Sequence, residues 1–256
     1  MNEVGKEIGH LHPVTRLVDA VGRIFTEMGF DVVDGPELET EYYNFDALNV
    51  PKDHPARDMQ DTFFVRQAPH PSEGKYLLRT HTSSVQVHKM KKWAEGSFQN
   101  DFLAVVVPGK VFRNEATDTT HEAQFFQVEG LCIGRDITLG HLQGVLGKFF
   151  SEIFGVDPVV RLRSSFFPFT EPSVEVDMQC VKCKGAGCFT CKEAGWIEIM
   201  GAGMVHPKVL EQCGIDSTKF QGFAFGGGLD RMAMLKWGID DVRLLYSGDL
   251  RVVNQF

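Results

Sequence analysis

Four cysteines of the sequence are spaced like the ligands of one metal ion. Cys180 and Cys183 form one pair, Cys188 and Cys191 form a second, and glycines lie between and after the pairs. Two residues between the members of a pair let both thiolates bind the same ion, and four thiolates complete the tetrahedral coordination of structural Zn²⁺. Disulfides or unligated thiols are the alternative, which a reducing compartment disfavours. We therefore predict a zinc-binding insertion at residues 179–195.

A second group of residues that could take part in chemistry lies on a predicted hairpin, which consists of one extended segment and the segment that returns alongside it. Arg113 and Glu115 stand two positions apart after an apolar run, and a polar loop at residues 116–121 leads into residues 122–130, where aromatic and polar side chains alternate. Such a hairpin presents every second side chain on one face and can aim them into a cavity. A surface ion pair between Arg113 and Glu115 is the simpler alternative, so the hairpin needs support from elsewhere.

That support comes from a glycine-rich segment near the C-terminus. Residues 226–228 are all glycine, and Leu-Asp-Arg231 follows them at the start of an apolar helical pattern. Glycines at such a turn let a ligand approach the backbone closely, and an arginine in the first helical turn adds a fixed cation at the same place. Tight packing alone can also require glycines, so this segment is informative only together with the hairpin.

The elements that must position these residues are indicated by hydrophobic periodicity. Residues 10–29 carry apolar side chains at helical spacing, and Gly29 stands where a left-handed cap is expected. Residues 30–36 alternate apolar and polar side chains up to Pro36, as in a strand that ends at a proline. Further strands are predicted at residues 103–107, 124–133, 159–166, 173–178, 196–200 and 220–225, and helices at residues 137–154, 207–213 and 228–236.

These elements predict an α+β fold. Strands outnumber helices, and several consecutive strands have connections too short for parallel crossovers, which favours a mostly antiparallel sheet flanked by helices over a doubly wound sheet. We expect one catalytic domain over residues 1–256, with the insertion at residues 179–195 within it.

Bulk properties narrow the class of protein. The chain has 256 residues, of which 43% are apolar and 23% are charged, as in soluble globular proteins. Neither a signal peptide nor a membrane-length apolar run is present, so we expect a cytoplasmic protein without membrane contact. The formal net charge of −8 provides no long-range attraction for a phosphate backbone, so any nucleic-acid contact must come from local basic residues or from a partner chain.

The order of these segments is similar to the three signature motifs of class II aminoacyl-tRNA synthetases. The helix, strand and Pro36 resemble the first motif, the Phe-Arg113-x-Glu115 hairpin the second, and Gly-Gly-Gly-Leu-Asp-Arg231 the third. Within that class, the chain resembles phenylalanyl-tRNA synthetase alpha subunits over nearly its whole length except residues 179–195. The segments that carry this closer resemblance are residues 43–51 (YNFDALNVP), 54–58 (HPARD), 78–83 (LRTHTS), 166–172 (FFPFTEP), 203–207 (GMVHP) and 222–226 (GFAFG).

The resemblance implies a site for ATP with Mg²⁺. Arg113 is expected to bridge the amino acid carboxylate and the α-phosphate of ATP, and the two arginines are the catalytic residues. Arg231 is expected to hold the ATP tail, with adenine between its guanidinium and the ring of Phe125. A general base is not required, because the attacking carboxylate is already a nucleophile. The remaining expected nucleotide contacts are Glu115, His121, Gly226 and Gly228.

The resemblance also implies a phenylalanine pocket. Its expected polar residues, which bind the ammonium and carboxylate, are His81, Ser83, Gln86, Gln127 and Glu129. Phe167, Phe169 and Ala224 are expected around the substrate ring, with the small Ala224 at the floor. Without the resemblance, exposed positions in polar loops are the alternative for the first group, and an ordinary core is the alternative for the two phenylalanines.

Partners and a second metal follow from the resemblance alone. The chain is expected to work as a heterotetramer with two beta subunits, which carry editing, and to bind tRNA(Phe). Glu171 resembles a family position that binds magnesium at the contact with the beta subunit, and a solvated carboxylate is the alternative. The family's tRNA-gripping coiled-coil arm has no counterpart before residue 10, so tRNA binding by this chain alone is not expected. Two other functions were weighed: a non-catalytic regulatory or nucleic-acid-binding paralogue, and a class II synthetase for another amino acid.

Overall fold

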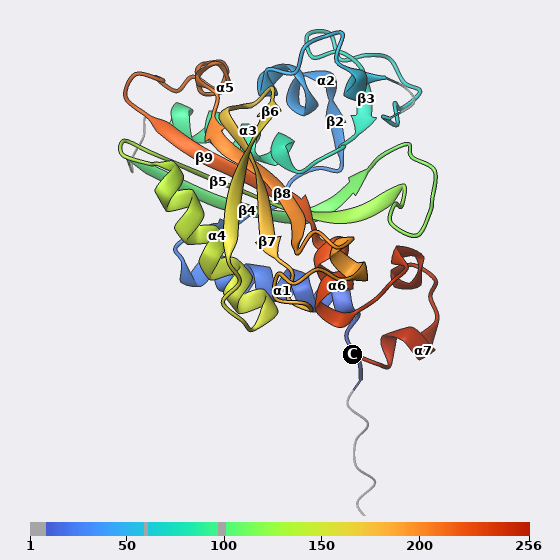
Figure 1. Ribbon diagram of the computed structural model, residues 1–256. Helices are drawn as coiled ribbons and strands as arrows, with labels where there is room; N and C mark the ends of the chain where they lie inside the picture. The colour runs from blue at the N-terminus through green and yellow to red at the C-terminus, as the bar shows by residue number, and fades with distance from the viewer. Residues whose placement is uncertain (1–8, 59–60, 97–100) are drawn as a thin grey trace, which may run out of the picture.

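The computed structural model describes residues 9–58, 61–96 and 101–256, and its centre is a seven-stranded sheet (Figure 1). The strands are β1 (Asp31–Val32), β4 (Phe102–Phe112), β5 (Gln124–Gly134), β6 (Val160–Phe167), β7 (Thr170–Gln179), β8 (Trp196–Val205) and β9 (Gln221–Gly228). They are hydrogen-bonded in the order β1-β4-β5-β9-β8-β7-β6. The C-terminal strand β9 thus lies in the middle of the sheet, between β5 and β8.

One pair of strands is parallel in a sheet that is otherwise antiparallel, in agreement with the mostly antiparallel sheet that the sequence predicts. β1 pairs with β4 in parallel, with Asp31 opposite Val105 and Val32 opposite Val106, whereas all the other neighbouring strands are antiparallel. The prediction depended on connections too short for crossovers, but residues 33–101 separate β1 from β4 and allow the crossover that a parallel pair needs. The sheet is therefore mixed.

Helices cover both faces of the sheet (Figure 1). On one face, α1 (Pro13–Glu27), α4 (Leu139–Phe154) and α6 (Leu229–Trp237) share a buried apolar cluster. On the other face, α3 (Ser83–Glu95) and α5 (Pro207–Gln212) share a second cluster. The remaining short elements are α2 (Glu41–Asn44), a two-stranded sheet of β2 (Leu38–Thr40) and β3 (Tyr76–Leu78), α7 (Leu250–Val253), and the 3-10 turns η1 (Asp46–Leu48), η2 (Pro55–Arg57), η3 (Phe189–Cys191) and η4 (Val242–Leu245).

The helix predicted at residues 10–29 is confirmed as α1. The side chain of His12 caps its N-terminus, where it accepts a hydrogen bond from the backbone. At its C-terminus, Gly29 has φ +85°, and the N–H of Phe30 donates to the carbonyl of Phe25 at 2.9 Å. This is the Schellman arrangement that a C-terminal glycine favours.

Several strands continue past the ends that the sequence predicts. β4 runs through Pro108 to Phe112, because β1 pairs only as far as Val106 and leaves the proline at an open edge. β8 likewise runs through Gly201. A Cβ at Gly201 would lie 2.8 Å from the ring of Phe167, so this glycine makes room for packing rather than ending the strand.

The helix α3 was not predicted, and residues 81–86 were interpreted as polar loop positions. Its first turn buries polar side chains, including Ser83, Ser84 and Gln86, which interrupt the expected apolar stripe. Its cap residue Thr82 also makes no side-chain capping hydrogen bond. Two of the expected phenylalanine contacts therefore lie on a helix and not in a loop.

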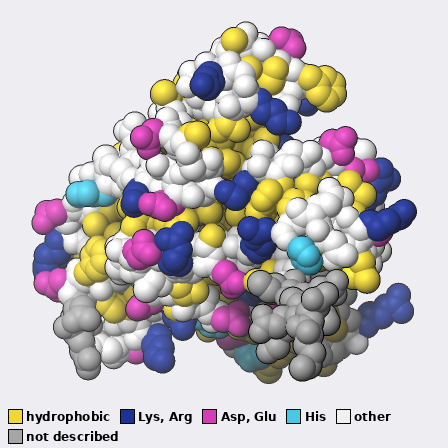
Figure 2. Space-filling view, turned by 90° about the horizontal axis from the view of Figure 1, so that it is seen from below, with side chains coloured by type: hydrophobic (Ala, Val, Ile, Leu, Met, Phe, Trp, Pro, Cys, Tyr) yellow, Lys and Arg dark blue, Asp and Glu magenta, His cyan; other side chains and the backbone are white. Residues whose placement is uncertain are grey.

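The outer surface carries mixed charge. On the face seen in Figure 2, acidic and basic side chains are interspersed among apolar ones. Within the described ranges, no helix has both the length and the apolar character that crossing a bilayer requires.

Candidate active site

The candidate site is built on one face of the sheet by the register of two strands. β5 pairs with β9 so that Gln127 lies opposite Gly228 and Glu129 lies opposite Gly226. Because alternate residues of a strand share a face, the polar side chains of the hairpin lie above the glycines of β9. Two segments far apart in the sequence thus contribute to one surface.

This surface belongs to a cavity of ≈ 760 Å³, a size suited to a small-molecule ligand. Arg113 and Arg231 both line it, so the two guanidinium groups face one space. The other lining residues among those expected from the sequence are His81, Ser83, Gln86, His121, Gln127, Glu129, Phe167, Phe169, Ala224 and Gly226. The expected residues that do not line it are Glu115, Phe125, Glu171 and Gly228.

Glu129 is the buried acid of the cavity. Its carboxylate accepts hydrogen bonds from the Ser83 hydroxyl and from the Thr82 backbone N–H, the latter at 3.1 Å. Burial raises the pKa of Glu129 to about 7, although these hydrogen bonds and the nearby Arg113 oppose the rise. A Cβ at Gly226 would lie 2.7 Å from Cγ of Glu129, so the glycine accommodates this side chain. Gly226 therefore serves tight packing, the alternative that the sequence left open, and it also lines the cavity.

Three buried polar atoms in the cavity lack a hydrogen-bond partner among the described residues. They are Nδ1 of His81, Nε2 of Gln86 and Oε1 of Gln127. Burial, with a further contribution from Arg113, lowers the pKa of His81 to about 3, which keeps the imidazole neutral near pH 7. Unpaired buried polar atoms cost free energy unless a ligand or water pairs with them. The cavity therefore offers one amide donor, one amide acceptor and a neutral imidazole to a ligand.

Arg113 enters the cavity as a cation without a carboxylate partner. Its Nε donates to the carbonyl of Thr80 at 3.3 Å, and it forms no ion pair within the part of the chain that the structure describes. Its guanidinium carbon lies 5.0 Å from the ring centroid of Phe125, which fixes the side chain by a cation–π contact. Burial lowers the pKa of Arg113, but an arginine stays charged at neutral pH.

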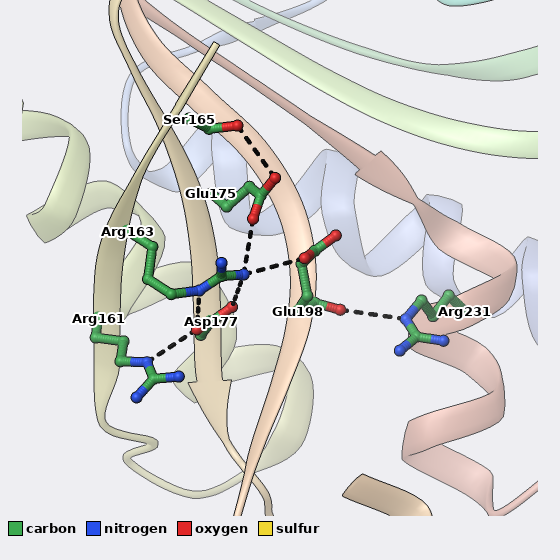
Figure 3. Close-up of polar contacts among 7 residues, drawn as sticks. All are labelled: Arg161, Arg163, Ser165, Glu175, Asp177, Glu198 and Arg231. Carbon is green, nitrogen blue, oxygen red and sulfur yellow. Dashed lines mark hydrogen bonds and ion pairs between the residues drawn. The ribbon is translucent and has the colours of Figure 1, made fainter. Parts of the chain in front are cut away.

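Arg231 lies in the first turn of α6, as predicted, and its Nε donates to the backbone carbonyl of Glu198 at 3.2 Å (Figure 3). Its other guanidinium N–H groups have no hydrogen-bond partner among the described residues. The side chain of Glu198 points the other way, to Arg163, whose Nη2 lies 3.1 Å from it and 2.7 Å from Glu175 (Figure 3). Both of these acids line the cavity.

The other end of the cavity is apolar. The rings of Phe167 and Phe169 are parallel, with centroids 5.8 Å apart and an interplanar angle of 5°. Ala224 is only partly buried on β9, where its methyl group faces the cavity. An apolar slot with two stacked rings on one side and a small residue at its floor suits a flat apolar group.

The remaining expected residues lie at or outside the margin of the cavity. His121 is exposed, and its Nδ1 lies 3.0 Å from the carboxylate of Asp118. Glu115 stands past the end of β4, in the loop of the hairpin. Glu171 is 72% exposed and lies 3.2 Å from Nε2 of His206, so the structure places it apart from the nucleotide cavity.

Sequence reasoning missed several residues that line or support the cavity. Glu175, Glu198 and Lys192 line it, but charged residues at strand and loop positions gave no signal of their own. Arg79 is 2% exposed and donates through Nε to the carbonyl of Lys110 at 2.7 Å, which joins the hairpin to the end of β3. Arg79 lies within residues 78–83, one of the segments that carry the family resemblance, and this resemblance is the one signal in the sequence that indicates a role for Arg79.

The four cysteines form a compact cluster whose sulfur atoms all lie within 4.8 Å of one another. Sγ of Cys180 lies 3.8 Å from that of Cys188, and Sγ of Cys191 lies 3.7 Å from those of Cys183 and Cys188. A regular tetrahedron with four zinc–sulfur bonds of about 2.3 Å has sulfurs about 3.8 Å apart, whereas a disulfide bond is about 2.05 Å. The cluster thus has the dimensions of a four-thiolate zinc site.

Comparisons with known proteins agree with these motifs. The family described as "tRNA synthetases class II core domain (F)" matches residues 2–256. The chain is 52% identical, over 250 residues, to the proteins named phenylalanine–tRNA ligase alpha subunit from Bacillus mycoides (strain KBAB4), Bacillus cytotoxicus and Bacillus cereus (strain B4264). The matches cover 98% of this chain and 70% of each relative. With its three motifs on one sheet, the chain therefore belongs to the class II aminoacyl-tRNA synthetases, in the family of phenylalanine–tRNA ligase alpha subunits.

Proposed function

We propose that this chain activates phenylalanine with ATP and transfers it to tRNA(Phe). The observation that carries the proposal is one cavity with an apolar aromatic slot at one end, unpaired polar atoms in the middle, and two guanidinium groups without carboxylate partners. An aromatic amino acid and a nucleotide triphosphate together supply the complementary groups. The family membership supports the same reaction.

In the first step, a carboxylate oxygen of phenylalanine attacks the α-phosphorus of ATP, and the electron pair of the broken P–O bond leaves with pyrophosphate. Arg113 offsets the repulsion between the carboxylate and the α-phosphate and the charge that develops between them. Its position is fixed in advance by Thr80 and Phe125, so little reorganisation is needed. In the second step, a hydroxyl of the terminal adenosine of the tRNA displaces AMP.

The amino acid is held by the unpaired atoms of the cavity. The ammonium donates to Oε1 of Gln127 and to the carboxylate of Glu129, which becomes ionised as the pair forms. Nε2 of Gln86 donates to the carboxylate, and the neutral His81 and the Ser83 hydroxyl complete the polar contacts. The phenyl ring packs against the side of the stacked Phe167 and Phe169 rings, above Ala224.

The nucleotide occupies the opposite end. Arg231 binds the phosphate tail and one face of adenine, while Gly226 and Gly228 leave room for it next to the backbone. Glu115, His121 and Phe125 are proposed as further nucleotide contacts: His121 already lines the cavity, whereas Glu115, in the hairpin loop, must move towards the ligand. Mg²⁺ accompanying ATP neutralises charge on the polyphosphate, and the carboxylates of Glu175 and Glu198 are the lining groups of the right chemistry.

We infer that Cys180, Cys183, Cys188 and Cys191 hold a structural zinc ion, and that residues 179–195 form a zinc-binding insertion within a catalytic domain spanning residues 1–256. The support is the tetrahedral spacing of the sulfurs described above. Zinc supplies a cross-link between the two cysteine pairs. Magnesium at Glu171 remains a prediction from the family alone, since that residue contributes a single exposed carboxylate.

Partners are likewise proposed. The names of the relatives support assembly with a beta subunit, and we propose that two alpha and two beta chains assemble in the cytoplasm. We propose that the two alpha chains meet symmetrically through α1 and β1, near which Leu11, Val32 and Leu38 are 57%, 46% and 43% exposed.

The test is pyrophosphate exchange with each of the twenty amino acids, with and without the beta subunit. We expect exchange that depends on phenylalanine, and a fall in kcat/KM of about 10²–10³-fold in Arg113→Gln and in Arg231→Gln. The matched control is Arg251→Gln, which removes an arginine that is 90% exposed and paired with Asp249. Exchange that depends on another amino acid would show that phenylalanine is not the substrate. An absence of exchange, with or without the beta subunit, would favour the non-catalytic alternative.

A further inference from the structure

One cation of the cavity comes from the cysteine cluster and has no role so far. Lys192 follows Cys191 directly and lines the same cavity as Arg231, Glu175 and Glu198. Its side chain forms no hydrogen bond or ion pair with the residues that the structure describes. The loop between β7 and β8 runs beside α6, the helix that bears Arg231 (Figure 1). An unpaired ammonium therefore lines the cavity that also contains the guanidinium of Arg231.

The backbone of Lys192 is held in a conformation that it does not prefer. Its φ is 50° and its ψ is 46°, in the left-handed region, and Glu193 follows with φ 63°. For residues other than glycine such conformations cost free energy and persist only where the surroundings impose them.

The surroundings in this case are the cysteine cluster. The N–H of Glu193 donates to the carbonyl of Cys188 at 2.9 Å, and the N–H of Gly195 donates to Sγ of Cys191 at 3.2 Å. Cys191 also belongs to the buried cluster that includes Leu229 of α6. The position of Lys192 thus depends on the geometry of the four sulfurs and on their packing against the helix that begins the third motif.

The charges at this end of the cavity leave a place for a further cation. ATP carries several negative charges on its tail, and Arg231 donates a hydrogen bond to the carbonyl of Glu198 on β8, the strand that follows the cysteine loop. The acids Glu175 and Glu198 are both paired with Arg163, so they do not neutralise Lys192. A lysine ammonium on a flexible stem acts as a point charge, which suits the mobile terminal phosphates of a nucleotide.

We infer that Lys192 is a further ATP-binding residue, which contacts the β- and γ-phosphates, and that zinc bound by the four cysteines sets ATP affinity by fixing the backbone at Lys192. This inference rests on the proposed function. It adds a role to the insertion beyond structural cross-linking, because the metal then controls a substrate contact.

The chain contains its own matched control. Lys184 follows Cys183 as Lys192 follows Cys191, and its φ is 51° against 50° for Lys192. Lys184 and Lys192 are both exposed, but only Lys192 lines the cavity. Replacing either lysine with methionine removes one charge from the same kind of backbone position, but only one of the two changes affects the cavity.

The experiment measures equilibrium binding of ATP and AMP, and the KM and kcat of phenylalanine-dependent exchange, in the enzyme assembled with its beta subunit. We expect Lys192→Met to raise the Kd and KM for ATP about tenfold. The Kd for AMP and the KM for phenylalanine stay unchanged, because neither ligand has terminal phosphates. Lys192→Arg restores most of the ATP affinity, and Lys184→Met behaves as wild type.

A second arm tests the metal. Zinc content is measured by atomic emission before and after chelation, and ATP binding is measured on the same samples. Zinc removal is expected to weaken ATP binding about tenfold in wild type and to have no further effect in Lys192→Met, since the two changes remove one interaction. Additive effects, or unchanged ATP affinity after zinc has been lost, would overturn the coupling.

The phosphate contact itself is overturned if Lys192→Met binds ATP as wild type does, if it loses AMP affinity equally, or if Lys184→Met weakens ATP binding to the same degree. A failure of the proposed function gives a different result, because the wild-type enzyme then shows no phenylalanine-dependent exchange. The lysine variants retain every cysteine, so this arm stands even if the zinc-free enzyme unfolds.

Discussion

The raised pKa of Glu129 predicts a pH dependence of phenylalanine binding. Burial holds this pKa at about 7 in the free protein, and the ammonium of phenylalanine pairs with the ionised form. The carboxyl group must therefore lose its proton on binding whenever the pH lies below 7. Affinity for phenylalanine is expected to rise with pH through this range and to level off above it.

The magnitude follows from the ionised fraction of Glu129. With a pKa of about 7, the ionised fraction is about 0.09 at pH 6.0 and about 0.76 at pH 7.5, so affinity should rise about eightfold between them. His81 has a pKa of about 3 and does not titrate in this range, and the guanidinium groups of Arg79 and Arg113 stay charged. Isothermal titration with phenylalanine at a series of pH values measures the dependence.

Two controls identify the group responsible. Glu129→Gln should bind phenylalanine more weakly at pH 7.5 and lose the eightfold dependence, and 3-phenylpropanoate, which has no ammonium, should not show the rise. His121→Gln removes the other imidazole of the cavity and should keep the dependence. If the wild-type profile is flat, or if Glu129→Gln reproduces it, the argument that links burial to ammonium recognition fails.

Three further changes test other parts of the structure. Ala224→Gly removes the methyl group at the cavity floor and should raise kcat/KM for para-chlorophenylalanine relative to phenylalanine about tenfold. The ratio is measured in amino-acid-dependent exchange, and an unchanged ratio would show that Ala224 does not contact the substrate ring. Tyr246→Phe deprives the buried Asp230 of a hydrogen bond and should lower the free energy of unfolding by about 1–3 kcal/mol. The measurement is the midpoint of urea unfolding, and the control is Tyr76→Phe, because the Tyr76 hydroxyl has no partner among the described residues. Cys183→Ser should lower the bound zinc, measured by metal analysis, below one ion per chain and make residues 179–195 more susceptible to proteolysis. A full zinc content in this variant would contradict binding by four thiolates.

The secondary structure was predictable where periodicity is strong. α1 and its left-handed cap at Gly29 follow from apolar spacing and one glycine, and α4 follows from a long apolar pattern. The central strands were found for the same reason, although their ends were misjudged where Pro108 and Gly201 lie inside a strand. Local patterns do not show whether a neighbouring strand or ring makes such a residue acceptable.

The missed parts depend on long-range contacts. α3 buries Ser83 and Gln86 against the cavity, so its polar residues face inwards and its sequence lacks a clear apolar stripe. The parallel pairing of β1 with β4 joins a two-residue strand to a distant partner, and no local pattern encodes it. The roles assigned to site residues still rest on the family resemblance, because nothing local relates Arg113 to Arg231 across more than a hundred residues.

The pairing of β5 with β9 has a consequence for how the protein becomes functional during synthesis. Gln127 and Glu129 emerge from the ribosome well before their partners Gly228 and Gly226. Until the last quarter of the chain is complete, the nascent protein lacks the floor of its pocket and the helix that begins at Leu229. A partly made chain therefore cannot sequester nucleotide, and substrate binding reports that translation of the domain has finished.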